Sequence, residues 1–297
     1  MSSIAFIGLG NMGRPMVEHL MAAGHALRVH ARRAEAMAPF AARGAVACAT
    51  PAEAARGAEF IFSNVTSSAD VEQVLVGPQG AIEGAAAGSV VIDHSTIAPA
   101  VTRRIAERLS ARGVEMLDCP VSGGVKGAQA ATLSIMVGGK AEVLARARPI
   151  LEKLGSAITH IGGHGAGQVA KACNQIVQVI TIQGIAEALL FAHAQGVDCG
   201  TVVGALQKGF AGSRMLDLMG PKMATRDFAA GIEARLHAKD YGLVMDAARD
   251  AQLAMPVTAQ VAQQLNALMG QGWGMDDTSS LLRVLESMNG AAGTRAG

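Results

Sequence analysis

Short apolar runs alternate with alanine-rich stretches along residues 1–161. The runs predict strands at Ile4–Ile7, Ala26–His30, Phe60–Asn64, Val90–Asp93, Glu115–Asp118, Leu133–Val137 and Ala157–Ile161. The stretches between them predict helices that include Met12–Ala23, Ala34–Arg43, Ala69–Leu75, Pro99–Arg112 and Ala141–Leu154. Because strand and helix follow each other in strict turn, we expect βαβ units that build a mostly parallel sheet with both faces covered.

The strand signals stop after Gly167. Residues Val169–Gln195 predict one helix about 40 Å long, and its apolar positions fall all round, which indicates that protein surrounds it. Further helices are predicted, among them Gly200–Lys208, Ala238–Gln252 and Val257–Met269, and the Gly-rich tail Asn289–Gly297 is expected to fray. We therefore predict an α/β domain over residues 1–162 and an all-α domain over residues 163–297.

Composition narrows the function classes. Half of the residues are hydrophobic and 16% are charged, with 36 glycines, which indicates extensive burial rather than disorder. Lysine and arginine number 25 against 24 acidic residues, and a net charge of +1 argues against nucleic acid or an anionic membrane as partner. Seven Phe, one Trp and one Tyr are also few for stacking along a single nucleic-acid strand.

Local sequence argues against a membrane span, a disulfide framework and a metal site. The most apolar stretch, Ile176–Ala194, is interrupted by polar residues such as Gln183, so we interpret it as a core helix. Four widely spaced cysteines and the lack of a basic-headed apolar N-terminus indicate a cytoplasmic protein with free thiols. His160 and His164 bracket two glycines that preclude a helical ligand face, so we expect no bound metal.

The motif Gly8-Leu9-Gly10-Asn11-Met12-Gly13 follows the first predicted strand and opens a predicted helix. In that context a G-x-G-x-x-G predicts a dinucleotide site: Gly8 for a tight turn, Gly10 for close approach of a pyrophosphate, and Gly13 for helix–strand packing. The phosphates would lie at a helix N-terminus, where the dipole favours an anion. A glycine turn without a ligand is the alternative.

The end of the second strand bears on which dinucleotide is bound. An acidic residue there would bind the ribose 2′-hydroxyl of NAD, but this chain has Arg32 and Arg33 and no acid before Glu35. Two guanidinium groups suit a 2′-phosphate, so we expect NADP(H) in preference to NAD(H). A solvated pair of arginines is the alternative.

Two later stretches predict the substrate site. The turn Asp118–Gly124 offers the Ser122 hydroxyl and the backbone N–H groups of Gly123 and Gly124, which suits a small carboxylate, although a plain strand-to-helix turn is the alternative. Spacings of three and four place Lys171, Asn174 and Gln178 on one helix face.

A buried lysine on that face, Lys171, is suited to give a proton to a carbonyl as hydride arrives, and Asn174 to orient the substrate. A lysine that reaches solvent from a structural helix is the alternative. Lys239, before Asp240, is either a second site lysine or a surface charge pair.

These motifs together resemble the β-hydroxyacid dehydrogenase family, which includes 3-hydroxyisobutyrate dehydrogenase and tartronate semialdehyde reductase. The matching stretches span nearly the whole chain in the family's order: Phe6–Gly13, Asp93–Pro99, Asp118–Gly124, the Gly167–Lys171–Asn174 face and Lys239-Asp240. Gly209–Asp217 is most similar to the tartronate semialdehyde reductase branch. One departure is Asn64-Val65-Thr66, where the family usually has a hydrophobic pair and then proline; this loop lines the cofactor.

The resemblance implies a Rossmann-like N-terminal domain, joined by a long helix to an all-helical domain that also builds a homodimer or homotetramer. It assigns Lys171 as the catalytic residue, gives Ser122, Gly123, Gly124 and Asn174 to the substrate, and gives Thr96 and Lys239 to the cofactor.

We therefore expect an NADP(H)-dependent enzyme that interconverts a short semialdehyde acid and its β-hydroxy acid. A 3-hydroxyisobutyrate dehydrogenase and a succinic semialdehyde or glyoxylate reductase are alternatives. A dinucleotide-binding protein without catalysis is less favoured, because Lys171 and Asn174 have the spacing that the chemistry needs.

Overall fold

The computed structural model describes residues 1–290, and within them nine strands form a single sheet. The order is β3-β2-β1-β4-β5-β6-β8-β7, and β9 pairs with β8. The strands are β1 Ser3–Ile7, β2 Ala26–His30, β3 Val46–Ala47, β4 Phe60–Ser63, β5 Val90–Asp93, β6 Glu115–Asp118, β7 Val121–Ser122, β8 Leu133–Gly138 and β9 Gly155–Gly162. Strands β1 to β6 are parallel, while β8 runs antiparallel to β6 and β7, so the mostly parallel sheet is confirmed. The order 3-2-1-4-5-6 is that of the Rossmann fold.

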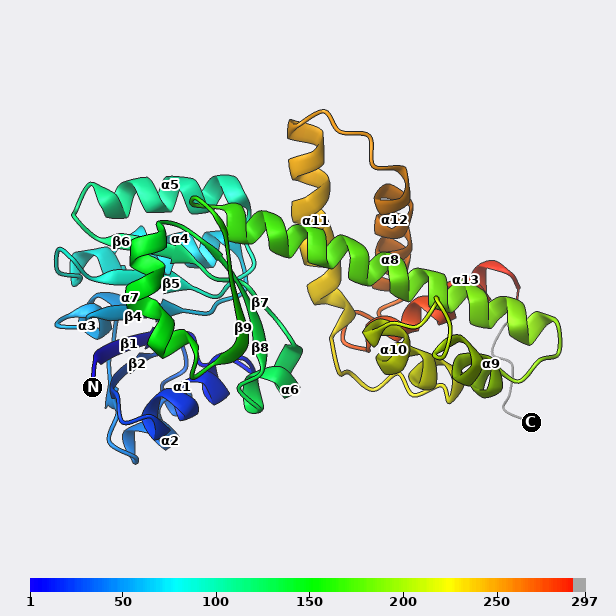
Figure 1. Ribbon diagram of the computed structural model, residues 1–297, viewed down its shortest axis with the longest axis horizontal. Coiled ribbons are helices and arrows are strands. Elements are labelled where there is room, and N and C mark those ends of the chain that lie inside the picture. The colour runs from blue at the N-terminus through cyan, green and yellow to red at the C-terminus, as the bar shows by residue number, and fades with distance from the viewer. Residues whose placement is uncertain (291–297) are drawn as a thin grey trace. The chain divides into compact units, whose positions relative to one another are not determined.

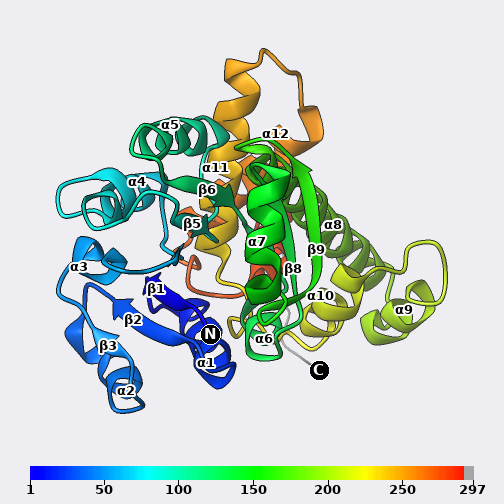
Figure 2. The ribbon, with the colours of Figure 1, turned by 60° about the vertical axis from the view of Figure 1, so that its left-hand side comes forward.

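Helices cover both faces of this sheet (Figures 1 and 2). They are α1 Gly13–Ala22, α2 Ala38–Ala41, α3 Pro51–Ala55, α4 Ser68–Val76, α5 Pro99–Ser110, α6 Gly124–Gln129 and α7 Ala141–Leu151. Successive strand residues point to opposite faces, so Ile4 and Phe6 join one core with α1 and α7, and Ala5 and Ile7 join a second core with α4 and α5. A strand buried on both sides explains why its sequence is continuously apolar.

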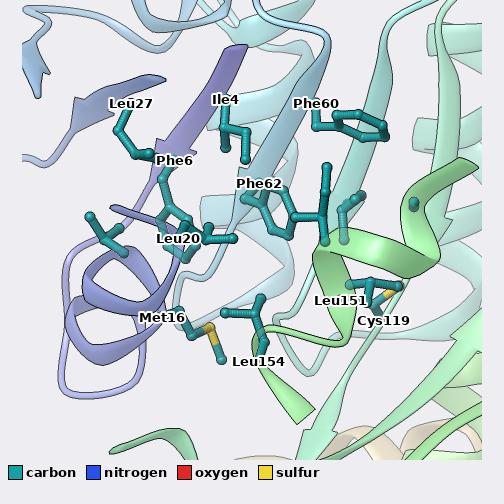
Figure 3. Close-up of a cluster of buried hydrophobic side chains, with 14 of the residues drawn as sticks. Ile4, Phe6, Met16, Leu20, Leu27, Phe60, Phe62, Cys119, Leu151 and Leu154 are labelled. Carbon is teal, nitrogen blue, oxygen red and sulfur yellow. The ribbon is translucent and has the colours of Figure 1, made fainter. Parts of the chain in front are cut away.

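The first core fixes the start of α1 next to the end of β1. Figure 3 shows Phe6 and Phe62 between α1 and the end of α7; their rings stack with centroids 5.7 Å apart. Met16 and Leu20 of α1 and Leu154 after α7 belong to the same cluster. This packing holds the glycine-rich turn, which lies between β1 and α1.

Compact packing divides the chain into Met1–Lys171 and a second unit from Ala172 onward. Up to residue 290 the second unit is helical and has no strand, as predicted, apart from a single β-bridge between Glu233 and Asp277. It contains the greater part of α8 Ala166–Ala194, then α9 Cys199–Leu206, α10 Arg214–Ala224, α11 Ala234–Asp250, α12 Pro256–Gly270 and α13 Leu281–Met288. Its core joins Val179 and Ile182 of α8 to Tyr241 of α11 and Leu265 of α12. The fraying predicted for Asn289–Gly297 falls, from residue 291 on, outside the described residues.

Helix α8 is long and apolar enough to cross a membrane by length and composition alone, a test that the core helix of a soluble protein also passes. One face of it supplies core residues, including Ile182 and Leu189. On another face Val177 and Phe191 are 66% and 68% exposed. The apolar positions all round the helix thus correspond to one buried and one exposed face within this chain.

The structure corrects the prediction of a single helix over Ala34–Arg43. A short 3₁₀ helix at Ala34–Ala36 is followed by α2, which begins at Ala38 with Pro39 in its first turn. Proline lacks an N–H and suits only the first turn of a helix, so it starts a new segment instead of continuing the old one.

Candidate active site

The glycine-rich turn has the geometry that a dinucleotide needs. Gly8 has φ +103°, and a Cβ there would overlap the carbonyl oxygen of Asn64, while a Cβ on Gly13 would overlap the carbonyl of Gly8. A Cβ on Gly10, in contrast, would meet nothing within 4 Å. The backbone is therefore tight on its protein side and open at Gly10, next to the N-terminus of α1, so these residues fit a pyrophosphate.

The loops after β4 and β5 are tied to this turn. Asn64 N donates to the carbonyl of Ile7 at 2.9 Å, and Val65 N donates to Ser95 Oγ at 2.9 Å. The departure at Asn64-Val65-Thr66 therefore leaves the loop anchored between β1 and Ser95. Both loops follow the carboxyl ends of strands: the loop after β4 lies where the strand order reverses, between β1 and β4, and the loop after β5 lies beside it. Open α/β sheets bind ligands at this reversal.

A buried acid holds the loop after β5. Asp93 Oδ1 accepts hydrogen bonds from Ser63 Oγ at 2.8 Å and from Ser95 Oγ at 2.7 Å. Burial raises the pKa of Asp93 to about 6, against the opposing effect of these bonds. Burial lowers the pKa of the adjacent His94 to about 4, although its bond of 2.6 Å to the carbonyl of Cys119 opposes the shift. Both groups are therefore built into the protein interior beside Thr96.

Arg32 and Arg33 follow β2 after one intervening residue, and the carbonyl of His30, the last residue of β2, accepts a hydrogen bond from Gly8 N at 2.9 Å. Both side chains are largely exposed, and each has an acidic neighbour at 3.9 Å: Asp70 for Arg32 and Glu35 for Arg33. Such long, solvated ion pairs are weak, so both guanidinium groups remain suited to exchange these partners for a phosphate.

The turn after β6 is not helical, as predicted. It passes through β7, and Gly123 adopts φ +134° before α6 begins at Gly124. Asp118, at the end of β6, points elsewhere: its carboxylate accepts from Gly165 N at 2.8 Å and from Gln168 N at 3.0 Å. A carboxylate that binds these N–H groups stabilises the start of α8. Ser122 is half-buried and Gly123 is exposed.

Gln168 connects α8 to the loop after β5. Its Oε1 accepts from Ile97 N at 3.1 Å and its Nε2 donates to the carbonyl of Ser95 at 2.8 Å, so both ends of its amide bracket Thr96. Lys171 follows one turn later and is 8% exposed. The catalytic residue expected from the sequence is therefore buried, on a helix whose first turn is bound to the cofactor-side loop. Sequence reasoning missed Gln168, because its partners lie about seventy residues away.

Asn174 belongs to a chain of polar contacts. Its Nδ2 donates to Gln175 Oε1 at 2.9 Å, and Gln175 Nε2 donates to Asp240 Oδ2 at 2.6 Å. Asp240 also pairs with Lys239 through Oδ1 at 2.9 Å. Lys239 is therefore partly buried in an ion pair. Among the described residues this chain runs through Gln175 and not through Gln178, which is half-buried on the same helix.

The two histidines considered for a metal are bound separately. His160 Nε2 lies 2.8 Å from the carbonyl of Gly139, and His164 Nε2 lies 3.1 Å from that of Met116. Within residues 1–290, no group of three His, Cys, Asp or Glu side chains is placed to hold a metal ion.

Comparison with known proteins agrees with this geometry. Residues 3–162 match the family described as the NAD-binding domain of 6-phosphogluconate dehydrogenase. Residues 165–285 match the NAD-binding domain of NADP-dependent 3-hydroxyisobutyrate dehydrogenase. The fold and the glycine-rich turn thus define an NAD(P)-dependent oxidoreductase.

Similarity to individual proteins extends over nearly the whole chain. The chain is 39% identical to 2-hydroxy-3-oxopropionate reductase of Escherichia coli, over 96% of this chain and 97% of that one. It is 40% identical to 3-hydroxyisobutyrate dehydrogenase of Pseudomonas aeruginosa, over 91% and 93%. A solved structure of Mycobacterium tuberculosis 3-hydroxyisobutyrate dehydrogenase with L-serine has a TM-score of 0.89 at 33% identity, over 96% and 99%.

The chain belongs to the β-hydroxyacid dehydrogenase family of 3-hydroxyisobutyrate dehydrogenase-like enzymes.

Proposed function

We propose that the protein interconverts a short semialdehyde acid and its β-hydroxy acid with NADP(H), as a tartronate semialdehyde reductase does, with Lys171 as general acid and base. The observation that carries this proposal is the burial of Lys171 one turn after Gln168, whose amide holds the cofactor-side loop. The similarity to 2-hydroxy-3-oxopropionate reductase, another name for that enzyme, supports the choice of substrate.

In this proposal one set of residues binds the dinucleotide and another set binds the substrate. The turn Gly8–Gly13, with Leu9, Asn11 and Met12 between its glycines, holds the pyrophosphate, while Val65, Thr96 and Lys239 contact the rest of the dinucleotide. The substrate carboxylate binds Ser122, Gly123 and Gly124, and Asn174 and Gln178 orient the carbon chain. Holding these groups together supplies the orientation that the reaction needs.

The dinucleotide, when bound, supplies or accepts the hydride. Lys171 gives a proton to the carbonyl oxygen of the semialdehyde during reduction and takes it back during oxidation. Its positive charge stabilises the alkoxide that develops before the proton arrives, and a site closed to water strengthens this effect.

Replacing Lys171 tests the proposal directly. We expect Lys171→Met, which keeps the volume and removes the ammonium group, to lower kcat by about 10²- to 10⁴-fold. NADPH binding, followed by fluorescence titration, should change little. Lys153→Met, at an exposed lysine, is the matched control. Near-normal turnover in Lys171→Met would remove this lysine from the mechanism.

The preference for NADP(H) has its own test. We expect Arg32→Asp to weaken NADPH far more than NADH, because a carboxylate repels the 2′-phosphate and can bind the 2′-hydroxyl. The ratio of the KM values for NADPH and NADH measures the effect, with Arg43→Asp, an exposed arginine beyond α2, as control. If the ratio in Arg32→Asp equals that of the wild type, Arg32 does not select the cofactor.

A second candidate, 3-hydroxyisobutyrate dehydrogenase, is supported by 40% identity to the Pseudomonas aeruginosa enzyme. Steady-state kinetics with tartronate semialdehyde, methylmalonate semialdehyde, succinic semialdehyde and glyoxylate would rank the candidates by kcat/KM. Lack of turnover with all four, in the presence of either cofactor, would favour a dinucleotide-binding protein without this catalysis.

We further propose a cytoplasmic homodimer or homotetramer, with a cofactor domain over residues 1–162 and a substrate and oligomerisation domain over residues 163–297. The exposed apolar residues Val177 and Phe191 of α8 support association between copies, because burial of such side chains is favourable. Sedimentation analysis distinguishes the two assemblies.

A further inference from the structure

The contacts of Asn174 define which end of its amide is available. Asp240 Oδ2 accepts a hydrogen bond from Gln175 Nε2 at 2.6 Å, and Oδ1 pairs with the ammonium group of Lys239, so Gln175 turns its NH₂ group toward Asp240. The oxygen of Gln175 then faces Asn174, which must donate through its own amide nitrogen. The carbonyl oxygen Oδ1 of Asn174 consequently lies on the side of the amide away from Gln175.

This polarity is strongly determined because the chain of contacts is buried. Gln175 and Asp240 are 4% and 7% exposed. A hydrogen bond of 2.6 Å to a carboxylate is short and charge-assisted, and reversal of the glutamine would set an oxygen against an oxygen. Lys239 provides the countercharge that a buried carboxylate needs.

A second contact, one residue further along each helix, joins α8 to α11 beside the Gln175–Asp240 hydrogen bond. The hydroxyl of Tyr241, the residue after Asp240, donates to the carbonyl of Ile176, the residue after Gln175, at 3.1 Å. Tyr241 is fully buried in the core of the helical unit. The separation of Gln175 and Asp240 is therefore maintained by core packing, so a change in the amide alone can be tested.

We propose that Gln175 and Asp240 are positioning residues that present the Asn174 carbonyl oxygen, and not its NH₂ group, to the substrate. An acceptor at that place recognises a hydrogen-bond donor, so the preferred substrates carry a hydroxyl group beside the reacting carbon, as a hydroxylated semialdehyde does. This inference rests on the proposed function, in which Asn174 contacts the substrate.

The charged groups around Gln175 and Asp240 influence how a glutamate at position 175 would ionise. Lys171 lies one turn before Gln175, Lys239 pairs with Asp240, and His237 lies one turn before Asp240 with its Nδ1 at 2.8 Å from Thr278 Oγ1. A glutamate at position 175 would face Asp240 across the same short contact. Two carboxylates so close share a proton, and the protonated glutamate reproduces the hydrogen-bond polarity of glutamine.

The test compares Gln175→Glu with Gln175→Met, which has similar length and no amide. We expect both variants to lose about tenfold to hundredfold in kcat/KM for tartronate semialdehyde at pH 9. As the pH falls to 6, Gln175→Glu should recover most of the loss, because the shared proton restores the donor to Asp240. Gln175→Met should remain impaired to the same degree throughout.

Two further readouts separate positioning from structural support. The melting temperature of Gln175→Glu, relative to wild type, should rise as the pH falls, since a raised folded-state pKa stabilises the protein only while the proton is bound. That of Gln175→Met should stay at a constant offset. In addition, both variants should lose more with tartronate semialdehyde than with succinic semialdehyde, which lacks the adjacent hydroxyl.

The outcomes distinguish this inference from the proposed function. If Gln175→Glu and Gln175→Met behave alike at every pH in both rate and melting temperature, the polarity inference is wrong. Equal losses with the two substrates would overturn the role in hydroxyl recognition. A wild-type protein that turns over neither semialdehyde would instead contradict the proposed function, and the melting data would still report on the Gln175–Asp240 contact.

Discussion

At the scale of single residues, Asp93 and His94 are neighbours whose pKa values shift in opposite directions. Burial raises the pKa of Asp93 to about 6 and lowers that of His94 to about 4. Each also has one buried polar atom, Asp93 Oδ2 and His94 Nε2, without a hydrogen-bond partner in the described part of the chain. Both groups therefore favour their neutral forms in the folded protein.

Their effects on stability should nearly cancel in the wild type. The stability that Asp93 contributes is present below its ordinary pKa, near 4, and is lost as the pH rises through about 6. The contribution of His94 is present above its ordinary pKa, near 6.5, and is lost as the pH falls through about 4. Each is worth up to about 3 kcal/mol.

Replacing either Asp93 or His94 should reveal the pH dependence of stability that the remaining group causes. Between pH 4.5 and 6.5 the free energy of unfolding of Asp93→Asn, relative to wild type, should rise with pH, and that of His94→Asn should fall. Asparagine keeps a hydrogen-bonding amide at each position, which limits the structural change. Urea denaturation at several pH values measures both slopes, and slopes of the same sign would contradict the shifts.

Local geometry at the candidate site could be predicted from the sequence where neighbours along the chain determine it. The spacing of Gly8, Gly10 and Gly13 contains the turn, the open approach and the helix contact that the structure has. Gln168 and Gln175 were missed because their partners, Ser95 and Asp240, lie far along the chain. Periodicity places Gln178 on the face of Lys171 and Asn174, and it gave no sign of the contacts that Gln175 makes with Asn174 and Asp240.

At the scale of elements, α8 depends on contacts in its first turn. Asp118 binds the N–H groups at its start, and Gln168 bonds the loop around Thr96. Long elements such as this one were predicted from pattern because many positions report the same period. The two-residue strands β3 and β7 were not, since pairing with a neighbouring strand and not side-chain pattern defines them.

Cutting the contact between α8 and the loop should affect cofactor binding and stability together. We expect Gln168→Met to leave Ile97 N and the Ser95 carbonyl unpaired in the interior, at a cost of about 1–3 kcal/mol for each group. The KM for NADPH should rise because Thr96 lies between the two. Chemical denaturation and NADPH titration measure these effects, with Gln129→Met, at an exposed glutamine, as control. Unchanged NADPH affinity in Gln168→Met would show that the loop around Thr96 does not contribute to cofactor binding.

At the scale of the whole molecule, the sequence indicated two units of different class, and the structure has them. The change from alternating strands and helices to helices alone was visible because it alters the period of the apolar pattern. The packing boundary after Lys171 falls within a continuous helix, where no turn residue or change of period marks it. The sequence pattern therefore located the change from α/β to all-α structure, but it did not locate the boundary between the two compact units.

The carboxylate of Asp118 has glycines on two sides. A side chain at Gly138 would overlap it, and a Cβ at Gly167 would overlap the backbone carbonyl oxygens of Met136 and Asp118 and also lie 2.8 Å from Asp118 Oδ2. In a survey of tolerated variants, position 138 should therefore accept glycine alone as long as an acid occupies position 118, whereas position 167 should require glycine whatever residue stands at 118. Intolerance at these two positions would reflect the space around one strand end, so it would mark a demand of folding and should not be mistaken for a demand of catalysis.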